Sequence, residues 1–473
     1  MQKLFKFLLI FLIVLGCDSN KSRPNVIFIL VDDLGWNDLG YSGNTFYETP
    51  NIDNLSKESF QFNNAYAASP VCSPTRASIM TGKHPARVNI TDWIPGADPQ
   101  NRALLGPKDL HNLPLEEITV AEKLKESGYN TFYVGKWHLG SQGFYPEDNG
   151  FDINIAGFEK GSPMGGYYSP YKNPKLNDGP KGEYLTDRLT DESIKLIKGH
   201  NKNEPFALFL SFYNVHTPIQ ANKKHINYFN KKISKMTNNE VRTKTEGDAI
   251  TRLNHTDTEY ASMVYAMDEN VGKLIKNLKD SDLYENSLII FTSDNGGLST
   301  LNRIARIAPT SVYPLRAGKG WLYEGGIRIP QLIKLPGNKE NVIVNDITAS
   351  YDLFPTILDF VGIKNNIDID GISLIPILNK QSEIDREDIF WHFPHYHGSL
   401  SKPGSAIRSG DWKLVFNYES NNAELFNLKE DPGEINDLSL LFEDKKQILL
   451  NKLNNLKNET NANKVSINPN FKN

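Results

Sequence analysis

Continuous apolar runs alternate with amphipathic segments along most of the chain, and this alternation limits the possible folds more than any other feature. Runs such as 25–31 and 287–292 predict strands that are buried on both faces, as in parallel sheets. The predicted strands are 25–31, 131–134, 206–213, 287–292 and 327–335, and the predicted helices are 119–127, 184–198, 258–278 and 351–361. We therefore expect an α/β fold with a large, mostly parallel sheet sandwiched by helices.

The pattern changes after residue 367. Short strand-like segments separated by Gly, Asp, Asn and Pro follow, and the last apolar periodicity is helical. The strands are predicted at 389–393, 405–408, 412–418 and 424–427, and the helix at 442–456. A chain of 473 residues exceeds the usual size of one domain. We expect a main domain at 25–367 and a smaller subdomain at 368–473, built from an antiparallel sheet plus a helix.

The first residues have the features of an export signal. Lys3 and Lys6 precede an apolar run at 7–15, which is short for a membrane span but suits a signal peptide. The run ends in Val14-Leu15-Gly16-Cys17, which resembles a bacterial lipobox. We expect a signal peptide at 1–17, a tether at 18–24, and a periplasmic or cell-surface lipoprotein that meets the membrane only through its lipid anchor. The alternative is a plain secretory signal with an incidental cysteine.

Overall charge and cysteine content exclude several classes of function. The formal net charge of -4 gives no general attraction to nucleic acid, so we expect no nucleic-acid partner. Positive charge that receives an anionic substrate must then be local. The chain has two cysteines, and Cys17 belongs to the export signal, so Cys72 is alone in the folded body and a disulfide scaffold is excluded.

Acidic residues follow two of the predicted strands directly. Asp32 and Asp33 come after strand 25–31, and Asp294 and Asn295 come after strand 287–292. Open α/β sheets place ligand sites at the carboxyl ends of their strands. Three carboxylates and an amide oxygen suit a hard cation such as Ca²⁺ or Mg²⁺. Taken singly, each residue would more often serve a turn or a helix cap, but two such endings on parallel strands favour a site.

The segment Cys72-Ser73-Pro74-Thr75-Arg76 carries the most specific signal. Pro74 suits the first turn of a helix, which would place residue 72 at the positive end of a helix dipole. The segment resembles the C-x-P-x-R signature of the formylglycine-dependent (type I) sulfatases of the alkaline phosphatase superfamily. The resemblance extends from about Arg23 to the Asp431-Pro432-Gly433-Glu434 stretch and implies an alkaline phosphatase/sulfatase-like fold. It makes 25–367 the catalytic domain.

The resemblance also implies the cofactors and their maturation. In that family a formylglycine-generating enzyme oxidises the cysteine, here Cys72, to 3-oxoalanine (Cα-formylglycine), whose hydrate is the nucleophile. One Ca²⁺ ion would be bound by Asp32, Asp33, Asp294 and Asn295, and by the modified residue 72.

Further residues match the family's active-site segments. Lys136 and His138 lie in a G-K-W-H motif, His216 lies in Asn214-Val215-His216-Thr217-Pro218, and Lys319 lies in Ala317-Gly318-Lys319-Gly320. The resemblance implies that Arg76, Lys136 and Lys319 neutralise the sulfate. It implies that His216 protonates the departing alcohol and that His138 takes the proton from the second hydroxyl of residue 72.

The predicted function is hydrolysis of sulfate esters, with a sulfated carbohydrate as the expected substrate. One alternative is a phosphodiesterase or phosphonate monoester hydrolase on the same fold, and the other is an inactive surface glycan-binding lipoprotein. Local cationic or hydrogen-bonding groups are expected to select the substrate. The candidates are Arg303, Arg316, His392, His395 and His397.

Overall fold

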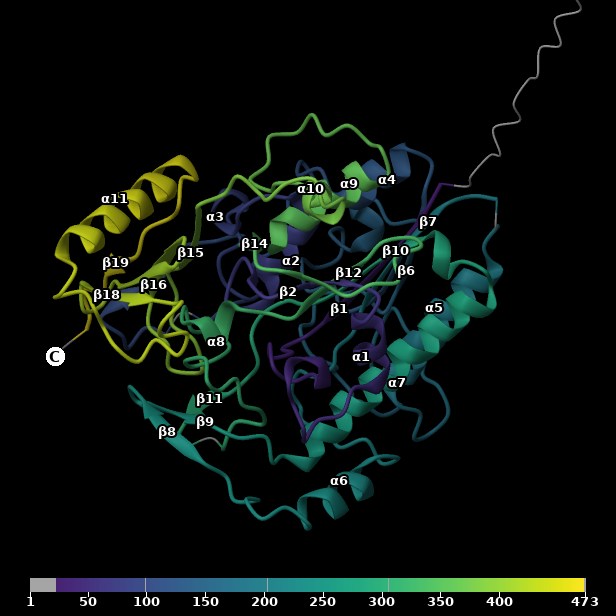
Figure 1. Ribbon diagram of the computed structural model, residues 1–473, viewed down its shortest axis with the longest axis horizontal. Coiled ribbons are helices and arrows are strands. Elements are labelled where there is room, and N and C mark those ends of the chain that lie inside the picture. Colours follow the sequence, from purple (N-terminus) through teal and green to yellow (C-terminus); the bar gives the residue numbers. More distant parts are fainter. Residues whose placement is uncertain (1–22, 98, 202, 305, 472–473) are drawn as a thin grey trace, which may run out of the picture.

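The computed structural model describes residues 23–97, 99–201, 203–304 and 306–471 (Figure 1). The predicted signal peptide at 1–17, with Cys17, and most of the predicted tether lie outside these residues. Within the described ranges, no helix combines the length and apolar content that a membrane crossing requires.

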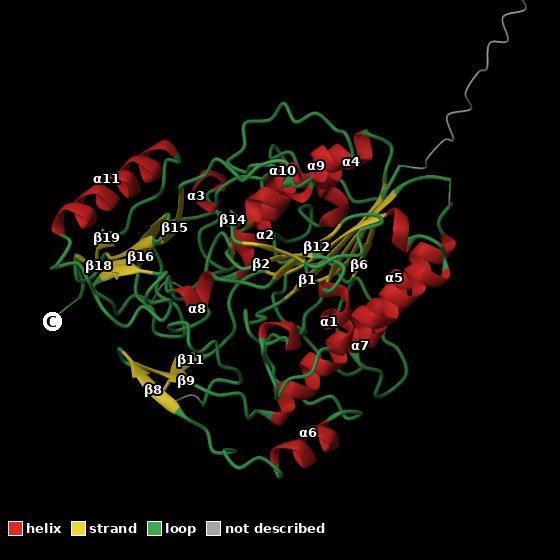
Figure 2. Cartoon of the chain, viewed as in Figure 1, coloured by secondary structure: helices red, strands yellow, loops and turns green. Residues whose placement is uncertain are grey.

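An eight-stranded sheet forms the centre of the described chain, with helices on both sides (Figure 2). In sheet order its strands are β13 (Val342–Val344), β2 (Phe60–Phe62), β12 (Gln331–Lys334), β10 (Ser287–Ser293), β1 (Asn25–Val31), β7 (Phe206–Ser211), β5 (Asn130–Gly135) and β6 (Ile153–Ile155). Pairing from β10 through β1, β7 and β5 to β6 is parallel. The predicted α/β class and mostly parallel sheet are therefore confirmed.

Strand β1 shows why an unbroken apolar run forms the middle of such a sheet. All seven of its residues are buried, and alternate side chains point to opposite faces. Ile27 and Ile29 pack with helices α1 (Pro50–Ser56), α5 (Leu185–Gly199) and α7 (Thr258–Asp280). Val26 and Phe28 pack with helices α2 (Cys72–Thr81), α4 (Val120–Glu126) and α9 (Leu353–Phe360). Both faces of the sheet are thus closed by helices.

One edge of the sheet differs from the sequence prediction. The predicted strand 327–335 begins only at Gln331, because residues 324–327 form the short helix α8 (Glu324–Ile327). Strand β12 then runs antiparallel to β10 and to β2. An apolar run carries no information on strand direction, which the preceding loop decides.

The remaining elements are short or lie outside the central layers. The helices are α3 (Pro85–Val88), α6 (Ile226–Ile233) and α10 (Ile375–Leu378). The strands are β3 (Ala65–Tyr66) with β14 (Thr348–Ala349), β4 (Leu104–Leu105) with β19 (Ser466–Ile467), and β8 (Thr243–Glu246), β9 (Ala249–Arg252) and β11 (Thr300–Asn302).

A separate four-stranded antiparallel sheet follows near the C-terminus, as the sequence predicts. Its strands are β15 (Asp388–Phe393), β16 (Gly404–Ser409), β17 (Trp412–Asn417) and β18 (Asn422–Asn427). Helix α11 (Glu443–Glu459) covers one face through Leu449 and Leu453. The other face packs on the main body, where Trp391 meets Tyr66 and Ile327. The division at residues 367 and 368 stays a prediction.

Candidate functional site

The residues at the ends of neighbouring parallel strands form one side of the candidate site, which we call its floor. Val31 of β1 pairs with Ser293 of β10, so Asp32 and Asp294 leave the sheet side by side. Gly135 of β5 pairs with Ser211 of β7, and Lys136 follows it at the same edge. The structure therefore brings together side chains that are more than 200 residues apart in the sequence.

Each buried carboxylate of the floor faces a cation. Lys136 Nζ lies 2.7 Å from Asp32 Oδ2, and Lys319 Nζ lies 2.7 Å from Asp33 Oδ1. Arg76 Nε donates to Asp294 Oδ2 at 2.8 Å. Burial alone would raise the pKa of Asp294, but Arg76 and Lys136 lower it. Buried charges persist only when they are paired in this way or bind a metal.

Two oxygens of the floor have no hydrogen-bond partner among the described residues. They are Asp32 Oδ1 and Asn295 Oδ1, and both are buried. Asn295 directs its amide nitrogen to Asp33 Oδ1 at 2.8 Å. Burial and Asp294 raise the pKa of Asp32 despite the nearby Lys136. Buried carboxylate and amide oxygens without a hydrogen-bond partner fit a hard divalent cation.

A set of possible metal ligands also includes a residue that the sequence did not assign to the metal. Ligand atoms of Asp32, Asp33 and His216 lie within 4.8 Å of one another. His216 Nε2 is 3.8 Å from Asp33 Oδ2. The fold brings His216 to this edge because it follows strand β7, which lies beside β1.

Cys72 is the first residue of helix α2 and is buried beside a histidine. Its Sγ lies 3.3 Å from His138 Nδ1, and the backbone carbonyl of Ile94 contacts the other nitrogen of that ring. Burial raises the pKa of the Cys72 thiol, although Lys136 and Lys319 oppose the shift. The unmodified thiol is thus protonated at neutral pH and is a poor nucleophile in this environment.

Lowered pKa values keep His138 and His216 neutral at neutral pH. Burial and the charge of Lys136 hold the pKa of His138 well below its ordinary value. Burial and the charge of Lys319 lower the pKa of His216 to about 3, although Asp33 acts in the opposite direction. A neutral imidazole can accept a proton, which is the state that a general base needs.

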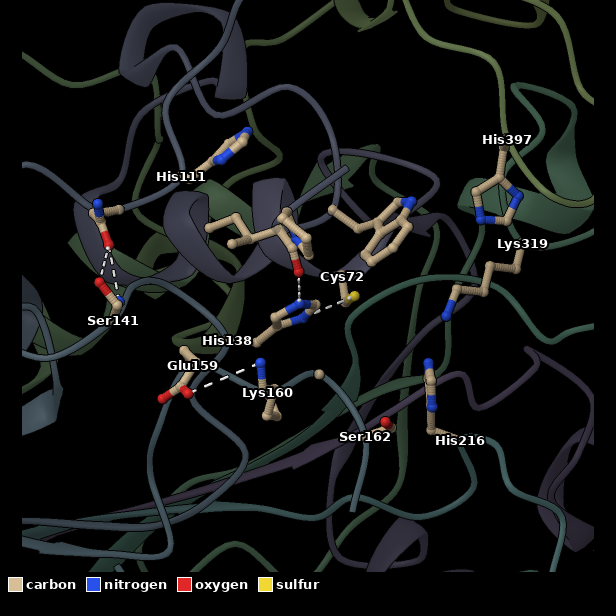
Figure 3. A pocket seen from close by; sticks show the side chains of 15 residues that line it. Cys72, His111, His138, Ser141, Glu159, Lys160, Ser162, His216, Lys319 and His397 are labelled. Atoms are coloured by element: carbon tan, nitrogen blue, oxygen red, sulfur yellow. Dashed lines mark hydrogen bonds and ion pairs between the residues drawn. The ribbon is translucent and has the colours of Figure 1, made fainter. Parts of the chain in front are cut away.

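A cavity of about 530 Å³ opens above Cys72 (Figure 3). Of the residues predicted from the sequence, it is lined by Cys72, His138, His216, Lys319 and His397. Arg76 and Lys136 do not line it and lie behind it with the carboxylates.

Four of the predicted substrate-selecting residues do not line this cavity. His392 hydrogen-bonds Ser405, and His395 contacts Thr91 Oγ1 at 2.9 Å. Arg316 pairs with Glu246, and Arg303 donates to Thr245. Their polar groups are engaged within the protein, so only His397 among the five reaches the described lining.

Several lining residues were missed by the sequence reasoning. They are Trp93, Ile94, Pro95, His111, Asn112, Ser141, Glu159, Lys160, Gly161 and Ser162. They come from the irregular stretches 87–111 and 159–181, from Asn112 directly after the first stretch, and from the turn at Ser141. The unusual length of those stretches was their only sequence signal.

Comparisons with known proteins agree over most of the chain. A family model described as Sulfatase matches residues 24–363, and one described as N-sulphoglucosamine sulphohydrolase, C-terminal, matches residues 317–463. A Formosa agariphila protein named Sulfatase is 30% identical over 501 residues, covering 89% of this chain and 85% of the relative. The human N-acetylgalactosamine-6-sulfatase is 30% identical over 401 residues, covering 80% of this chain and 70% of the relative.

A solved structure matches the fold over nearly the whole chain. The crystal structure of Ps i-CgsB in complex with k-i-k-neocarrahexaose aligns with a TM-score of 0.74 at 27% identity. The alignment covers 95% of this chain and 94% of that one.

Proposed function

Because the chain belongs to the sulfatase family and is a sulfuric ester hydrolase, we propose that it removes sulfate from a sulfated carbohydrate. The human relative is named as an N-acetylgalactosamine-6-sulfatase, and Ps i-CgsB was solved with k-i-k-neocarrahexaose. The cavity of about 530 Å³ is large enough for a sugar unit with its sulfate.

The proposed nucleophile is residue 72 after oxidation of Cys72 to Cα-formylglycine by a formylglycine-generating enzyme. The observation that carries this proposal is the contact at 3.3 Å between Cys72 Sγ and His138 Nδ1, two residues that line the cavity. The position at the start of the ten-residue helix α2 favours a bound anion. The raised pKa of the thiol argues that an unmodified cysteine is not the nucleophile.

The proposed metal is one Ca²⁺ ion held by Asp32, Asp33, Asp294 and Asn295, together with residue 72. The unpartnered Asp32 Oδ1 and Asn295 Oδ1 support this assignment. When bound, the ion supplies positive charge that orients the sulfate and acidifies a hydroxyl. Metal analysis should find one calcium per chain, and chelation should lower the midpoint of thermal unfolding. Stoichiometric zinc, or an unchanged midpoint after complete chelation, would contradict the assignment.

The hydrated aldehyde would supply two hydroxyls on one carbon, one to attack sulfur and one to release sulfate afterwards. Lys319, which lines the cavity, neutralises charge on the sulfate oxygens, and Arg76 and Lys136 add positive charge from behind the lining. Stabilising this charge is the main demand of sulfuryl transfer. His216, together with Lys319, gives a proton to the departing alcohol oxygen. The negative charge of a bound sulfate ester raises the pKa of His216 and lets it hold that proton. His138, which contacts residue 72, accepts a proton from the second hydroxyl.

Two measurements test this function. Mass spectrometry of the peptide that contains residue 72 should show the aldehyde in place of the thiol, and an aryl sulfate should be hydrolysed much faster than the matching aryl phosphate. Faster cleavage of the phosphate would favour a phosphodiesterase or phosphonate monoester hydrolase. No turnover of any ester by protein that carries the aldehyde would favour an inactive glycan-binding protein.

We further propose that the chain is an exported bacterial lipoprotein acylated at Cys17. The basic and apolar composition of residues 1–17 supports this proposal. Labelling of the cells with a lipid precursor should mark the wild-type protein and not the Cys17→Ala variant.

A further inference from the structure

The wall of the cavity formed by residues 159–162 carries a lysine that the proposed mechanism does not use. Lys160 lines the same cavity as Cys72 and Lys319. Figure 3 shows Lys160 beside Glu159, with Cys72 and Lys319 among the other side chains of the same lining. A substrate in this cavity therefore has the positive charge of Lys160 within the lining as well as that of Lys319.

Close packing of Gly161 against His138 fixes the backbone beside Lys160. A Cβ atom added to the next residue, Gly161, would lie 2.3 Å from His138 Cε1. The backbone at residue 161 thus packs directly against the ring that contacts Cys72, and any side chain there would displace it. This contact holds the backbone of the loop that carries Lys160 beside the reacting centre.

The charge of Lys160 is only weakly engaged within the protein. Lys136 and Lys319 each lie 2.7 Å from a carboxylate oxygen, whereas Lys160 Nζ lies 3.9 Å from Glu159 Oε1. Glu159 also accepts a hydrogen bond from Tyr145 at 2.8 Å. Because the lysine side chain is 48% exposed, its pairing contributes little, and turning towards a ligand costs little. Glu159 is the one carboxylate among the described residues that line the cavity.

The rest of the lining suits a sugar ring. Trp93, Ile94 and Pro95 form an apolar stretch of wall against which the C–H face of a pyranose can pack. A ring held there, with one sulfate at Cys72, directs its other substituents towards the polar residues of the wall.

We propose that Lys160 binds a second anionic group, a sulfate or a carboxylate, on the sugar that carries the scissile sulfate. The preferred substrate is then a sugar unit with at least two negative charges. This inference rests on the proposed sulfatase function, since it places the scissile sulfate at residue 72.

Three aryl sulfates test the inference: a plain one, one that carries a carboxylate and one that carries a second sulfate. The wild-type enzyme should show the higher kcat/KM on one or both substituted probes, and the better probe identifies the anion. Lys160→Met should lower kcat/KM on that probe about 10- to 100-fold, the effect of one charge-assisted hydrogen bond. Hydrolysis of the plain probe should change by no more than about twofold, because Lys160 has no part in the chemical step.

Two control variants separate a local charge effect from other causes. Lys160→Arg keeps the charge and should retain the preference for the substituted probe. Lys181→Met removes an exposed charge outside the lining and should leave all three rates unchanged.

The outcomes distinguish this inference from the function on which it rests. No preference of the wild-type enzyme for either substituted probe, or an equal loss on all probes in Lys160→Met, overturns the role of Lys160 while sulfatase activity stands. Failure of the wild-type enzyme on all three probes overturns the proposed function as well.

Discussion

His216 and His397 line the same cavity but differ in what surrounds them. His216 Nε2 faces Asp33, and burial together with Lys319 lowers the pKa of His216. His397 Nδ1 contacts Ser399 Oγ at 2.8 Å. Comparing variants of the two residues therefore separates the effect of losing a proton donor from the effect of losing a side chain that lines the cavity.

We predict that His216→Ala slows hydrolysis more for a substrate whose leaving group must be protonated than for one whose leaving group departs as an anion. A sugar sulfate should lose about 10²- to 10⁴-fold in kcat, the usual contribution of a general acid. A nitrophenyl sulfate should lose much less, because its phenolate departs without protonation. In the control, His397→Ala, any loss should be similar for both substrates. Equal losses on both substrates in His216→Ala would remove this residue from the acid role.

At the scale of elements, a buried ion network joins the C-terminal sheet to the loop that carries Lys319. Lys413 Nζ on β17 lies 3.0 Å from Glu324 Oε1 on α8 and 2.8 Å from Glu434 Oε1. All three side chains are fully buried. Burial and Glu324 raise the pKa of Glu434 to about 7, although Lys413 opposes the shift. Removing the lysine would take away the cation that the two carboxylates share and leave Glu324 with Arg328 at 3.6 Å.

We predict that Lys413→Met lowers the free energy of unfolding by about 3 to 5 kcal/mol, as breaking a buried ion pair does. The matched variant Lys402→Met removes an exposed partner of Glu419 and should cost no more than about 1 kcal/mol. Urea unfolding at neutral pH measures both. Equal, small losses would show that the network contributes little to docking of the C-terminal sheet.

The sequence predicted the elements where burial gives a regular pattern and failed where it does not. The apolar runs that become β1, β7 and β10 have the expected bounds to within two residues. The hairpin of β8 and β9 was missed because its polar, partly exposed residues carry little strand signal. The direction of β12 could not be predicted from the sequence either, because it depends on the path of the preceding loop.

The same contrast holds for the site. The floor residues could be predicted because they follow strands directly or lie in family motifs. Glu159 and Lys160 could not, since no periodicity places an irregular loop over Cys72. The sequence could suggest His397 as a residue of the site. It could not show that His397 lines the cavity while its neighbour His395 hydrogen-bonds Thr91.

At the scale of the whole molecule, the buried His84 makes packing of the C-terminal sheet on the main body sensitive to acid. His84 Nε2 contacts the carbonyl of Phe390 on β15 at 3.1 Å, and the two rings stack 3.9 Å apart. Burial lowers the pKa of His84 to about 4, from an ordinary value of 6.5. The folded-state pKa lies below the unfolded one, so this contribution to stability is complete above pH 6.5 and is lost as the pH falls towards 4.

We predict that wild-type protein loses up to about 3 kcal/mol more than His84→Gln when the pH falls from 7 to 4. Glutamine keeps a polar group at this position but does not titrate. The measurement is urea unfolding of both proteins at several pH values, so that carboxylates common to both cancel. Parallel curves over the whole range would show that His84 does not carry this pH dependence.

The most direct test of the central claim, that residue 72 acts through two hydroxyls on one carbon, uses Cys72→Ser made in a host that does not convert the serine. A serine hydroxyl can still attack sulfur, but its sulfate ester has no neighbouring hydroxyl from which His138 can take a proton. Intact-protein mass spectrometry after incubation with an aryl sulfate should show one added sulfuryl group per chain and at most a single turnover. Sustained turnover by the unconverted serine variant would contradict the account and favour a phosphatase-like mechanism.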